Sequence, residues 1–311
     1  MKKIAIFCSE YDENCGGIMV MHYLCHLLRE IGVEAYMFPR FGNFLINFST
    51  AQNHEYMKLL EYEMNVSNQI FIQKNYKLNP DFTTPTLFEI PINGFSDEWV
   101  IIYPENTIGN PTNAKNIIRW LLAPPLTHSN LFTINRNELI IEYEKGLGKF
   151  IANDIKNTEF ILNIQYIMID IYKNKNYKNR NMYNSCFSIR KGQNKKITHD
   201  TTKSICIDGL SHGEISQIFN STEVFISYDS ASFYSQYAVM CGAKSIVIPD
   251  DNYTLEQWRT IPTKQGIAYG FDDLEWANNT KENLLSYLFN KNLNNSIITK
   301  EFNKIINTNF G

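Results

Sequence analysis

An acidic residue followed by three small residues is the feature of this 311-residue chain best suited to chemistry. The apolar run Val224–Ser227 predicts a strand, which delivers Tyr228 and Asp229 to its carboxyl end. Ser230-Ala231-Ser232 then leads into a predicted helix, 232–241. Ligands of open α/β sheets bind at that edge, and free N–H groups at a helix start favour phosphate. The Asp229 carboxylate is suited to binding sugar hydroxyls; the alternative is that it only caps the helix.

Two cations follow another predicted strand of the second half, Ser185–Ile189. Arg190 and Lys191 come directly after it and precede Gly192. Two positive charges at a strand end can neutralise a diphosphate, and a guanidinium can bind it through two parallel hydrogen bonds. The alternative is a solvated pair of charges with no ligand.

Acidic residues also follow the first predicted strand of the chain, Ile4–Cys8. Glu10 and Asp12 lie between this strand and Gly16-Gly17, which opens a predicted helix. A carboxylate here is placed to act as general base for a hydroxyl. A hydrophilic turn with glycines for backbone freedom is the alternative. Because the pair does not complete G-x-G-x-x-G, the pattern does not predict a dinucleotide site.

A third acidic position, Glu105, follows the predicted strand Trp99–Tyr103 and Pro104, so it should also lie at a sheet edge. Asn110 comes shortly after Glu105, and we expect the two residues to line the same part of the site. The segment 114–122 reads as a helix ended by two prolines. Within it Arg119 is the candidate to pair with a local acid.

The elements that carry these residues alternate between strands and helices of about ten residues, which predicts parallel sheets. Further strands are predicted at 34–38, 139–143, 160–164, 204–207 and 245–248. Helices are predicted at 18–31 and 211–219, and one or two helices over 281–310. A length of 311 residues suits two domains. We expect a first domain over 1–170, a basic, Asn-rich linker over 171–184, a second domain over 185–290, and a helical tail over 291–311 that packs back on the first domain.

Composition excludes several function classes. Lys and Arg total 29 against 32 Asp and Glu, which gives a formal charge of −3 and argues against a nucleic-acid binder. The six cysteines are scattered and form no C-x-x-C pair, so neither a zinc site nor a disulfide framework is expected. The first apolar run is too short for a signal peptide, and no run is long enough for a transmembrane helix. We therefore expect a cytoplasmic protein.

The segment from Tyr228 to Pro249 resembles the donor-site segment of glycosyltransferases with the GT-B fold. Many of those enzymes carry two glutamates eight positions apart, of which the first contacts the donor sugar and the second the ribose. Asp229 falls on the first position. Tyr237 falls on the second, where this sequence departs from the pattern, so it is not assigned as an equivalent ligand.

Other segments resemble the same group. Residues 207–219 are similar to its base-binding loop and helix, and Arg190-Lys191 stands where GT-B enzymes often place cations on the donor diphosphate. More narrowly, Tyr103-Pro104-Glu105, Gly109-Asn110-Pro111 and the segment 119–122 resemble bacterial polysaccharide glycosyltransferases. The resemblance implies an α/β fold of two Rossmann-like domains whose parallel sheets face a central cleft.

It also implies transfer of a sugar from a nucleotide-sugar donor to a hydroxyl of a growing surface glycan, of the capsule or lipopolysaccharide type. The acceptor would be an oligosaccharide or a lipid-linked glycan at the cytoplasmic face of the inner membrane. No cofactor and no metal are expected, since GT-B enzymes generally act without one and no D-x-D motif of the other major glycosyltransferase fold is present. A nucleotide-sugar epimerase and a non-catalytic glycan-binding relative are the alternatives.

The residues and the resemblance together predict three groups of site residues. They are a catalytic group of Asp12, Glu105 and Asp229; a donor-binding group of Arg190, Lys191, Tyr228, Asp229, Ser230, Ser232 and Ser235; and an acceptor-side group of Glu10, Gly16, Gly17 and Asn110.

Overall fold

The computed structural model describes residues 2–40, 76–127, 132–149, 151, 157–177, 180, 182–251, 253–259 and 262–311. The chain divides into two compact units. Unit 1 consists of Met1–Tyr166 together with Leu293–Gly311, and unit 2 consists of Ile167–Asn292. Within the described ranges, no helix combines the length and the apolar character needed to cross a membrane.

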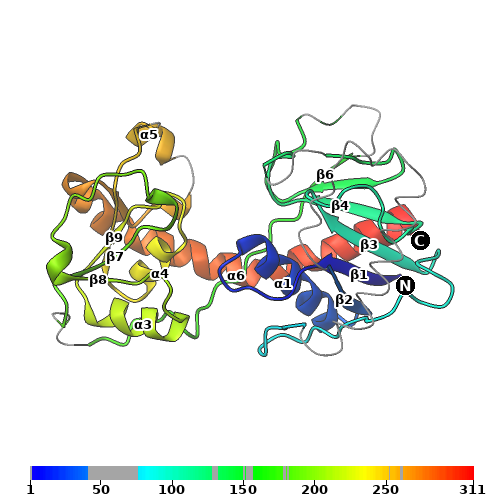
Figure 1. Ribbon diagram of the computed structural model, residues 1–311, viewed down its shortest axis with the longest axis horizontal. Helices are drawn as coiled ribbons and strands as arrows, with labels where there is room; N and C mark the ends of the chain where they lie inside the picture. Colours follow the sequence, from blue (N-terminus) through cyan, green and yellow to red (C-terminus); the bar gives the residue numbers. More distant parts are fainter. Residues whose placement is uncertain are drawn as a thin grey trace. The chain divides into compact units, whose positions relative to one another are not determined.

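Unit 1 is built on a six-stranded sheet in the order β2-β1-β3-β4-β5-β6, in which all neighbouring strands are parallel (Figure 1). The strands are β1 (Lys3–Cys8), β2 (Ala35–Pro39), β3 (Trp99–Pro104), β4 (Ile117–Leu121), β5 (Leu139–Glu142) and β6 (Asn157–Ile161). Every residue of β3, β4 and β5 is buried. Strands covered on both faces read as continuous apolar runs, which explains the composition of these segments.

Helix α1 (Gly16–Glu30) follows β1, as its periodic apolar residues predict. Met21, Leu24 and Leu28 lie on its buried face and share one hydrophobic cluster with alternate residues of the sheet. The helix ends at Glu30, and Gly32 follows its C-cap with a φ of +81°, a conformation that glycine adopts without strain.

The predicted helix over 114–122 is wrong, because Ile117–Leu121 forms strand β4 in the middle of the sheet. A short apolar run that is buried all round cannot be assigned to strand or helix from periodicity alone. Two β-branched residues, Ile117 and Ile118, favour the strand. The sheet position gives β4 neighbours on both sides, β3 and β5.

Unit 2 has a five-stranded parallel sheet in the order β11-β10-β9-β7-β8. Its strands are β7 (Ser185–Ser188), β8 (Ser204–Cys206), β9 (Val224–Ser227), β10 (Lys244–Val247) and β11 (Ile267–Tyr269). Its shorter helices are α3 (His212–Ser221), α4 (Tyr234–Met240) and α5 (Leu255–Trp258), with 3-10 turns at Arg190–Gly192, Thr201–Lys203, Pro262–Lys264 and Phe271–Asp273. A capping box opens α3, where a helix was predicted from 211: Ser211 Oγ accepts from Glu214 N, and Ser211 N donates to the Glu214 carboxylate.

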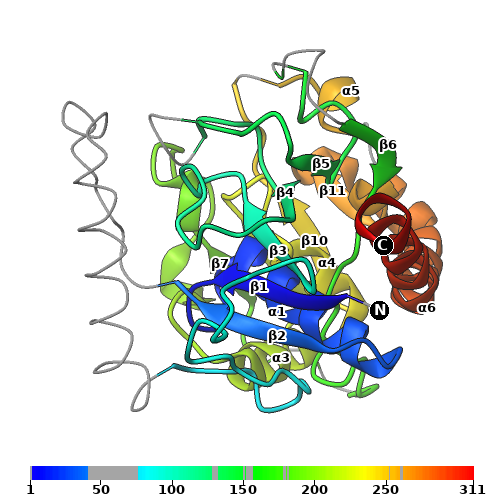
Figure 2. The same ribbon diagram turned by 90° about the vertical axis from the view of Figure 1, so that its right-hand side faces the viewer.

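One long helix, α6 (Leu274–Phe310), contributes to both units (Figures 1 and 2). Its beginning packs Ala277 on Ile246 of the unit 2 sheet. Its end places Phe302 and Ile306 in the hydrophobic cluster of unit 1. The sequence predicted one or two helices over 281–310, and the structure has a single helix that starts earlier.

Each sheet contains a point at which the strand order reverses. In unit 1, the chain runs from β1 to β2 on one side and then to β3 on the other side of β1. In unit 2, it runs from β7 to β8 and then to β9 on the other side of β7. Ligands of open α/β sheets bind at such switch points, outside the carboxyl ends of the strands. The prediction of two Rossmann-like α/β domains with parallel sheets is confirmed.

Candidate functional site

The switch point of unit 2 lies between the carboxyl ends of β7 and β9, and Asp229 follows β9 there. This side chain is 6 % exposed, and its Oδ1 accepts a hydrogen bond of 3.0 Å from Ala231 N. Ser227 Oγ donates to the Asp229 carbonyl oxygen at 2.8 Å. Asp229 therefore caps the turn that follows it, which agrees with the alternative prediction of a capping role. Only one of its two carboxylate oxygens makes this contact. No described residue donates to the second oxygen within hydrogen-bonding distance.

Lys264 brings a positive charge to the same turn and was not identified from the sequence. Its Nζ donates to the Ser230 carbonyl oxygen at 2.8 Å and lies 4.6 Å from the centre of the Trp258 ring. Trp258 Nε1 donates to the same carbonyl at 3.1 Å. Burial lowers the pKa of Lys264 to about 8, and the negative charge of Asp229 opposes that shift. No motif marks Lys264, which lies in the 3-10 turn Pro262–Lys264 and not at the end of a strand.

Arg190 begins the loop after β7 with a φ of +39°, which is uncommon for a residue with a side chain. Such a conformation costs roughly 1–2 kcal/mol and persists only where neighbouring contacts hold it. The Asp208 carboxylate accepts from the backbone N–H groups of Ile189 and Arg190 at 2.8 and 3.1 Å. The Arg190 guanidinium lies over the Tyr234 ring, 5.2 Å from its centre. The following residue, Lys191, is exposed.

The loops after β7 and β9 touch through a glycine. A Cβ atom added to Gly192 would lie 2.2 Å from the carbonyl oxygen of Tyr228, so no other residue fits there without a backbone shift. The Tyr228 ring is fully buried with Phe187 and Ile226. Its hydroxyl accepts from Thr198 N at 2.9 Å and lies 2.7 Å from His199 Nδ1. The Tyr228 side chain thus packs in the core next to the site, and its backbone carbonyl group packs against the loop after β7.

The three predicted serines lie along the turn into α4. Ser230 offers the carbonyl oxygen that Lys264 and Trp258 share. Ser232 Oγ accepts from Tyr234 N at 3.3 Å. Ser235 is 2 % exposed, and its hydroxyl has no hydrogen-bond partner among the described residues. A buried hydroxyl without a partner is unfavourable in a protein interior.

Tyr237, at the position where GT-B enzymes often carry a second carboxylate, is part of the packing of unit 2. Its ring stacks on Tyr172 with 3.9 Å between ring centres and 9° between ring planes. Its hydroxyl accepts from Met168 N at 3.5 Å. Tyr237 therefore ties α4 to the segment that precedes β7.

In unit 1, Glu105 follows β3 at the switch point. Its carboxylate is 6 % exposed, and Oε2 accepts from Leu122 N at 3.0 Å. Arg40, which follows β2, donates from Nη1 to Asn106 Oδ1 at 2.5 Å and from Nη2 to the Asn106 carbonyl at 3.2 Å. Burial lowers the pKa of Arg40, and the negative charge of Glu105 opposes the shift. Arg40 was not among the residues predicted from the sequence, because a single cation at the end of a short strand is not a specific signal.

The loop after β1 carries the other predicted residues of unit 1. Glu10 and Asp12 are exposed, and Asp12 Oδ1 accepts from Asn14 N at 2.8 Å in a local turn. Gly16 and Gly17 form the first turn of α1. His22 of α1 holds the start of this loop, because its Nε2 lies 3.0 Å from the Ser9 carbonyl oxygen. Burial lowers the pKa of His22 to about 4, so it is a neutral core histidine at pH 7.

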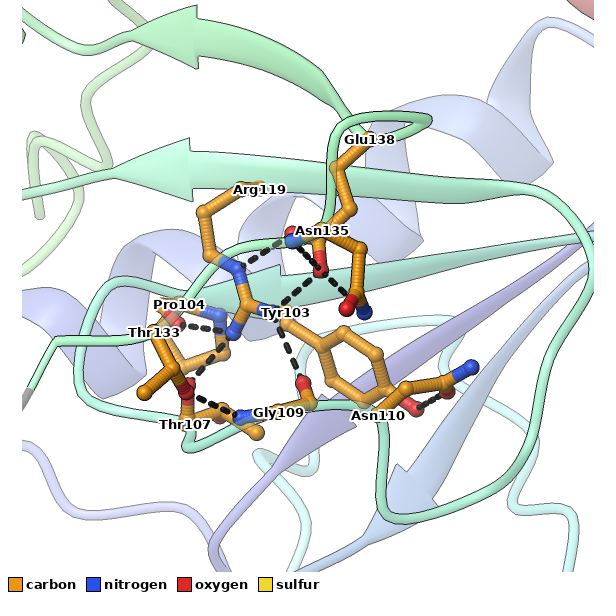
Figure 3. Close-up of polar contacts among 9 residues, drawn as sticks. All are labelled: Tyr103, Pro104, Thr107, Gly109, Asn110, Arg119, Thr133, Asn135 and Glu138. Carbon is orange, nitrogen blue, oxygen red and sulfur yellow. Dashed lines mark hydrogen bonds and ion pairs between the residues drawn. The ribbon is translucent and has the colours of Figure 1, made fainter. Parts of the chain in front are cut away.

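Asn110 shapes the loop that follows Glu105. Its Oδ1 accepts from the Tyr103 hydroxyl and from Ala114 N, both at 3.0 Å, and its Nδ2 donates to the Ala114 carbonyl at 2.9 Å. The Oδ1 atom and one N–H of Nδ2 are therefore bonded within the protein, and the contact with Tyr103 is drawn in Figure 3. This places Asn110 as a structural support of the predicted acceptor side.

Arg119 is buried beside this loop and pairs with a buried acid, as the sequence suggested (Figure 3). Its Nε donates to Glu138 Oε2 at 2.9 Å and its Nη2 to Glu138 Oε1 at 3.1 Å. The remaining guanidinium donors reach the carbonyl oxygens of Thr107 at 2.6 Å and Gly109 at 2.8 Å. The ion pair thereby fixes the backbone that carries Glu105 and Asn110.

The site residues thus fall into one group at each switch point. Asp229, Ser230, Ser232, Ser235 and the Arg190 loop come together in unit 2, joined by Lys264 and Asp208. Glu105, Glu10, Asp12 and Arg40 belong to unit 1. Within the described part of the chain, no group of three or more His, Cys, Asp or Glu residues is arranged to hold a metal ion.

No protein-family model matches the chain, and no curated protein sequence matches it. Among solved structures, the chain is similar to a sucrose-phosphate synthase from Thermosynechococcus elongatus, with a TM-score of 0.43 and 9 % sequence identity. The match covers 97 % of this chain and 94 % of that one. Likeness at this level does not transfer an activity from one protein to the other.

Proposed function

We propose that the chain is a glycosyltransferase that moves a sugar from a nucleotide-sugar donor to a hydroxyl of a growing surface glycan. The observation that carries the proposal is the composition of the unit 2 switch point. The largely buried carboxylate of Asp229 lies there with the ammonium group of Lys264. Asp229 follows β9, and Arg190 follows the neighbouring strand β7. A nucleotide sugar needs this combination, because its sugar hydroxyls favour a carboxylate acceptor and its diphosphate needs cations.

In the proposed reaction, an acceptor hydroxyl oxygen attacks the anomeric carbon, and the bond from that carbon to the diphosphate oxygen breaks. The hydroxyl proton passes to a carboxylate, for which Asp12 and Glu105 are the candidates. The electron pair of the broken bond stays on the diphosphate, whose added charge Arg190 and Lys264 stabilise. This assignment needs no metal ion, because protein cations take that role.

The segments of unit 1 that resemble bacterial polysaccharide enzymes support the finer part of the proposal. They point to an oligosaccharide or lipid-linked acceptor, of the kind used to build capsule or lipopolysaccharide at the cytoplasmic face of the inner membrane. In this scheme unit 2 takes the donor, and unit 1 contributes the acceptor-side residues Glu10, Asp12 and Glu105.

Calorimetric titration with UDP, GDP, CDP, ADP and dTDP tests donor binding. We expect one of them to bind, and the matching nucleotide sugar then serves as donor in a transfer assay. The variant Asp229→Ala should lower kcat/KM by at least about 100-fold, because a group that contacts the reacting sugar is lost. Asp200→Ala, which changes an exposed aspartate of the same unit, is the matched control.

Failure of all five nucleotides to bind the folded protein would contradict the proposal. Full activity of Asp229→Ala would remove that residue from the mechanism. Conversion of the nucleotide sugar to an epimer in the absence of acceptor would instead identify an epimerase.

A further inference from the structure

We propose that Asp208 is a positioning residue that sets Arg190 for the donor diphosphate. This inference rests on the proposed function. Asp208 comes two residues after β8, the strand that neighbours β7 in the sheet, so the ends of the two strands meet at one edge. Asp208 lies in the segment 207–219 that resembles a base-binding loop and helix, and no individual role was predicted for it.

Both oxygens of the Asp208 carboxylate are directed at the end of β7. Oδ1 accepts from Ser188 Oγ at 2.5 Å, and Oδ2 accepts from Ile189 N at 2.8 Å and from Arg190 N at 3.1 Å. Three consecutive residues therefore donate to one side chain. Hydrogen bonds to an ionised acceptor are shorter and stronger than those between neutral groups, so this contact can hold an unfavourable backbone conformation.

The conformation that it holds is that of Arg190, whose φ is +39°. A glycine would adopt it without strain, yet the position carries an arginine. Two residues later Gly192 packs directly on the Tyr228 carbonyl oxygen, so the loop is fixed at its other end as well. The direction of the Arg190 side chain, over the Tyr234 ring, follows from this backbone. Without the Asp208 carboxylate, Arg190 is expected to relax to negative φ and turn its guanidinium away.

The experiment compares binding of the nucleoside diphosphate selected above with binding of its nucleoside. Asp208→Asn keeps the size of the side chain, but an amide offers an acceptor on one side only. We expect it to weaken diphosphate binding by about tenfold and leave nucleoside binding within about twofold. Asp200→Asn is the matched control, because the Asp200 carboxylate accepts from Thr202 N at 3.0 Å in a comparable local contact away from β7. It should change neither affinity.

A double-mutant cycle then asks whether Asp208 acts through Arg190. In an Arg190→Gln background, Asp208→Asn should have almost no further effect on diphosphate binding, because the group that it positions is already gone. Additive losses would overturn the proposal, as would equal losses of diphosphate and nucleoside binding by Asp208→Asn.

Failure of the positioning role can be distinguished from failure of the proposed function. If the wild-type protein binds a diphosphate and Asp208→Asn binds it equally well, the positioning role is wrong and the proposed function stands. If the wild-type protein binds no nucleotide, both are wrong. Should Asp208→Asn fail to fold in a thermal-unfolding test, Ser188→Ala removes one of the three hydrogen bonds and should show a smaller loss that is again confined to the diphosphate.

Discussion

Lys264 places an ammonium group at the turn that carries Asp229, in contact with the Ser230 carbonyl oxygen and the face of Trp258. Burial makes the charged form of this lysine less favourable and lowers its pKa to about 8. Below that pH the group is a cation, and above it the group is neutral. A lysine in this state can contribute to binding an anion at neutral pH and loses that ability in mild alkali.

Affinity for the nucleoside diphosphate should therefore fall as the pH rises from 7 through 8 to 9. We expect a loss of about fivefold, the equivalent of one net hydrogen bond of roughly 1 kcal/mol. In Lys264→Arg the loss should disappear over this range, since a guanidinium stays protonated. Calorimetric titration across the pH series measures both, with the nucleoside as the uncharged control ligand. A wild-type affinity that does not change between pH 7 and 9 would exclude Lys264 from the diphosphate site.

Asp229, Arg190 and Glu105 could be predicted as site residues, because each follows a buried strand that the sequence shows. Lys264 could not, because it lies in a 3-10 turn between β10 and β11 and not at the end of a strand. Asp208 follows a predicted strand, but its contact with Arg190 depends on the order of the strands in the sheet, which the sequence does not reveal. Asp208, for example, meets Arg190 only because β7 and β8 are neighbours.

At the scale of elements, the buried ion pair of Arg119 and Glu138 organises the segment between β3 and β5. Arg119 comes from β4, and Glu138 comes immediately before β5. Both side chains are fully buried, and the arginine also binds carbonyl oxygens of the loop after β3. The pair therefore couples the register of two strands to the shape of the loop that holds Glu105.

Arg119→Met should destabilise the protein by about 3–5 kcal/mol, because the Glu138 charge is left buried without its partner. Urea unfolding measures the change. The double variant Arg119→Met, Glu138→Leu should recover most of the loss, since no unpaired charge remains. An Arg119→Met protein as stable as the wild type would show that the pair does not fix this loop.

The segment that carries Arg119 also shows where prediction of elements from the sequence fails. A helix ended by two prolines was predicted over 114–122, yet Arg119 lies in the central strand β4, where Glu138 neutralises its charge inside the protein. The helix over 211–219 was recognisable by contrast, because Ser211 and Glu214 form a local capping box that needs no distant partner.

At the scale of the whole molecule, α6 belongs to the cores of both units. Its last part gives unit 1 the fully buried Phe302, whose ring lies parallel to that of Phe160 with 6.4 Å between ring centres. Its first part packs on the unit 2 sheet through Ala277. The sequence predicted a helical tail that returns to the first domain, but not a single helix shared by two cores.

Phe302→Ala should lower stability by about 3–5 kcal/mol, through lost burial and the cavity left behind. Hydrogen exchange read by mass spectrometry should show the loss of protection in β1, β3 and α1. Affinity for the nucleoside diphosphate should be unchanged at a temperature where the protein is folded. Phe289→Ala, on the same helix but 59 % exposed, is the matched control and should stay within about 0.5 kcal/mol of the wild type. Equal effects of the two variants would contradict a role of α6 in the core of unit 1.

The central claim is that the carboxyl edge of the unit 2 sheet binds the donor. A crystal structure of the protein with its selected nucleoside diphosphate tests this most directly. We predict that the diphosphate lies between the ends of β7 and β9, with a phosphate oxygen within hydrogen-bonding distance of Arg190 and the Asp229 carboxylate facing the position of the sugar. A nucleotide bound at the amino ends of the strands, or on unit 1, would contradict the claim.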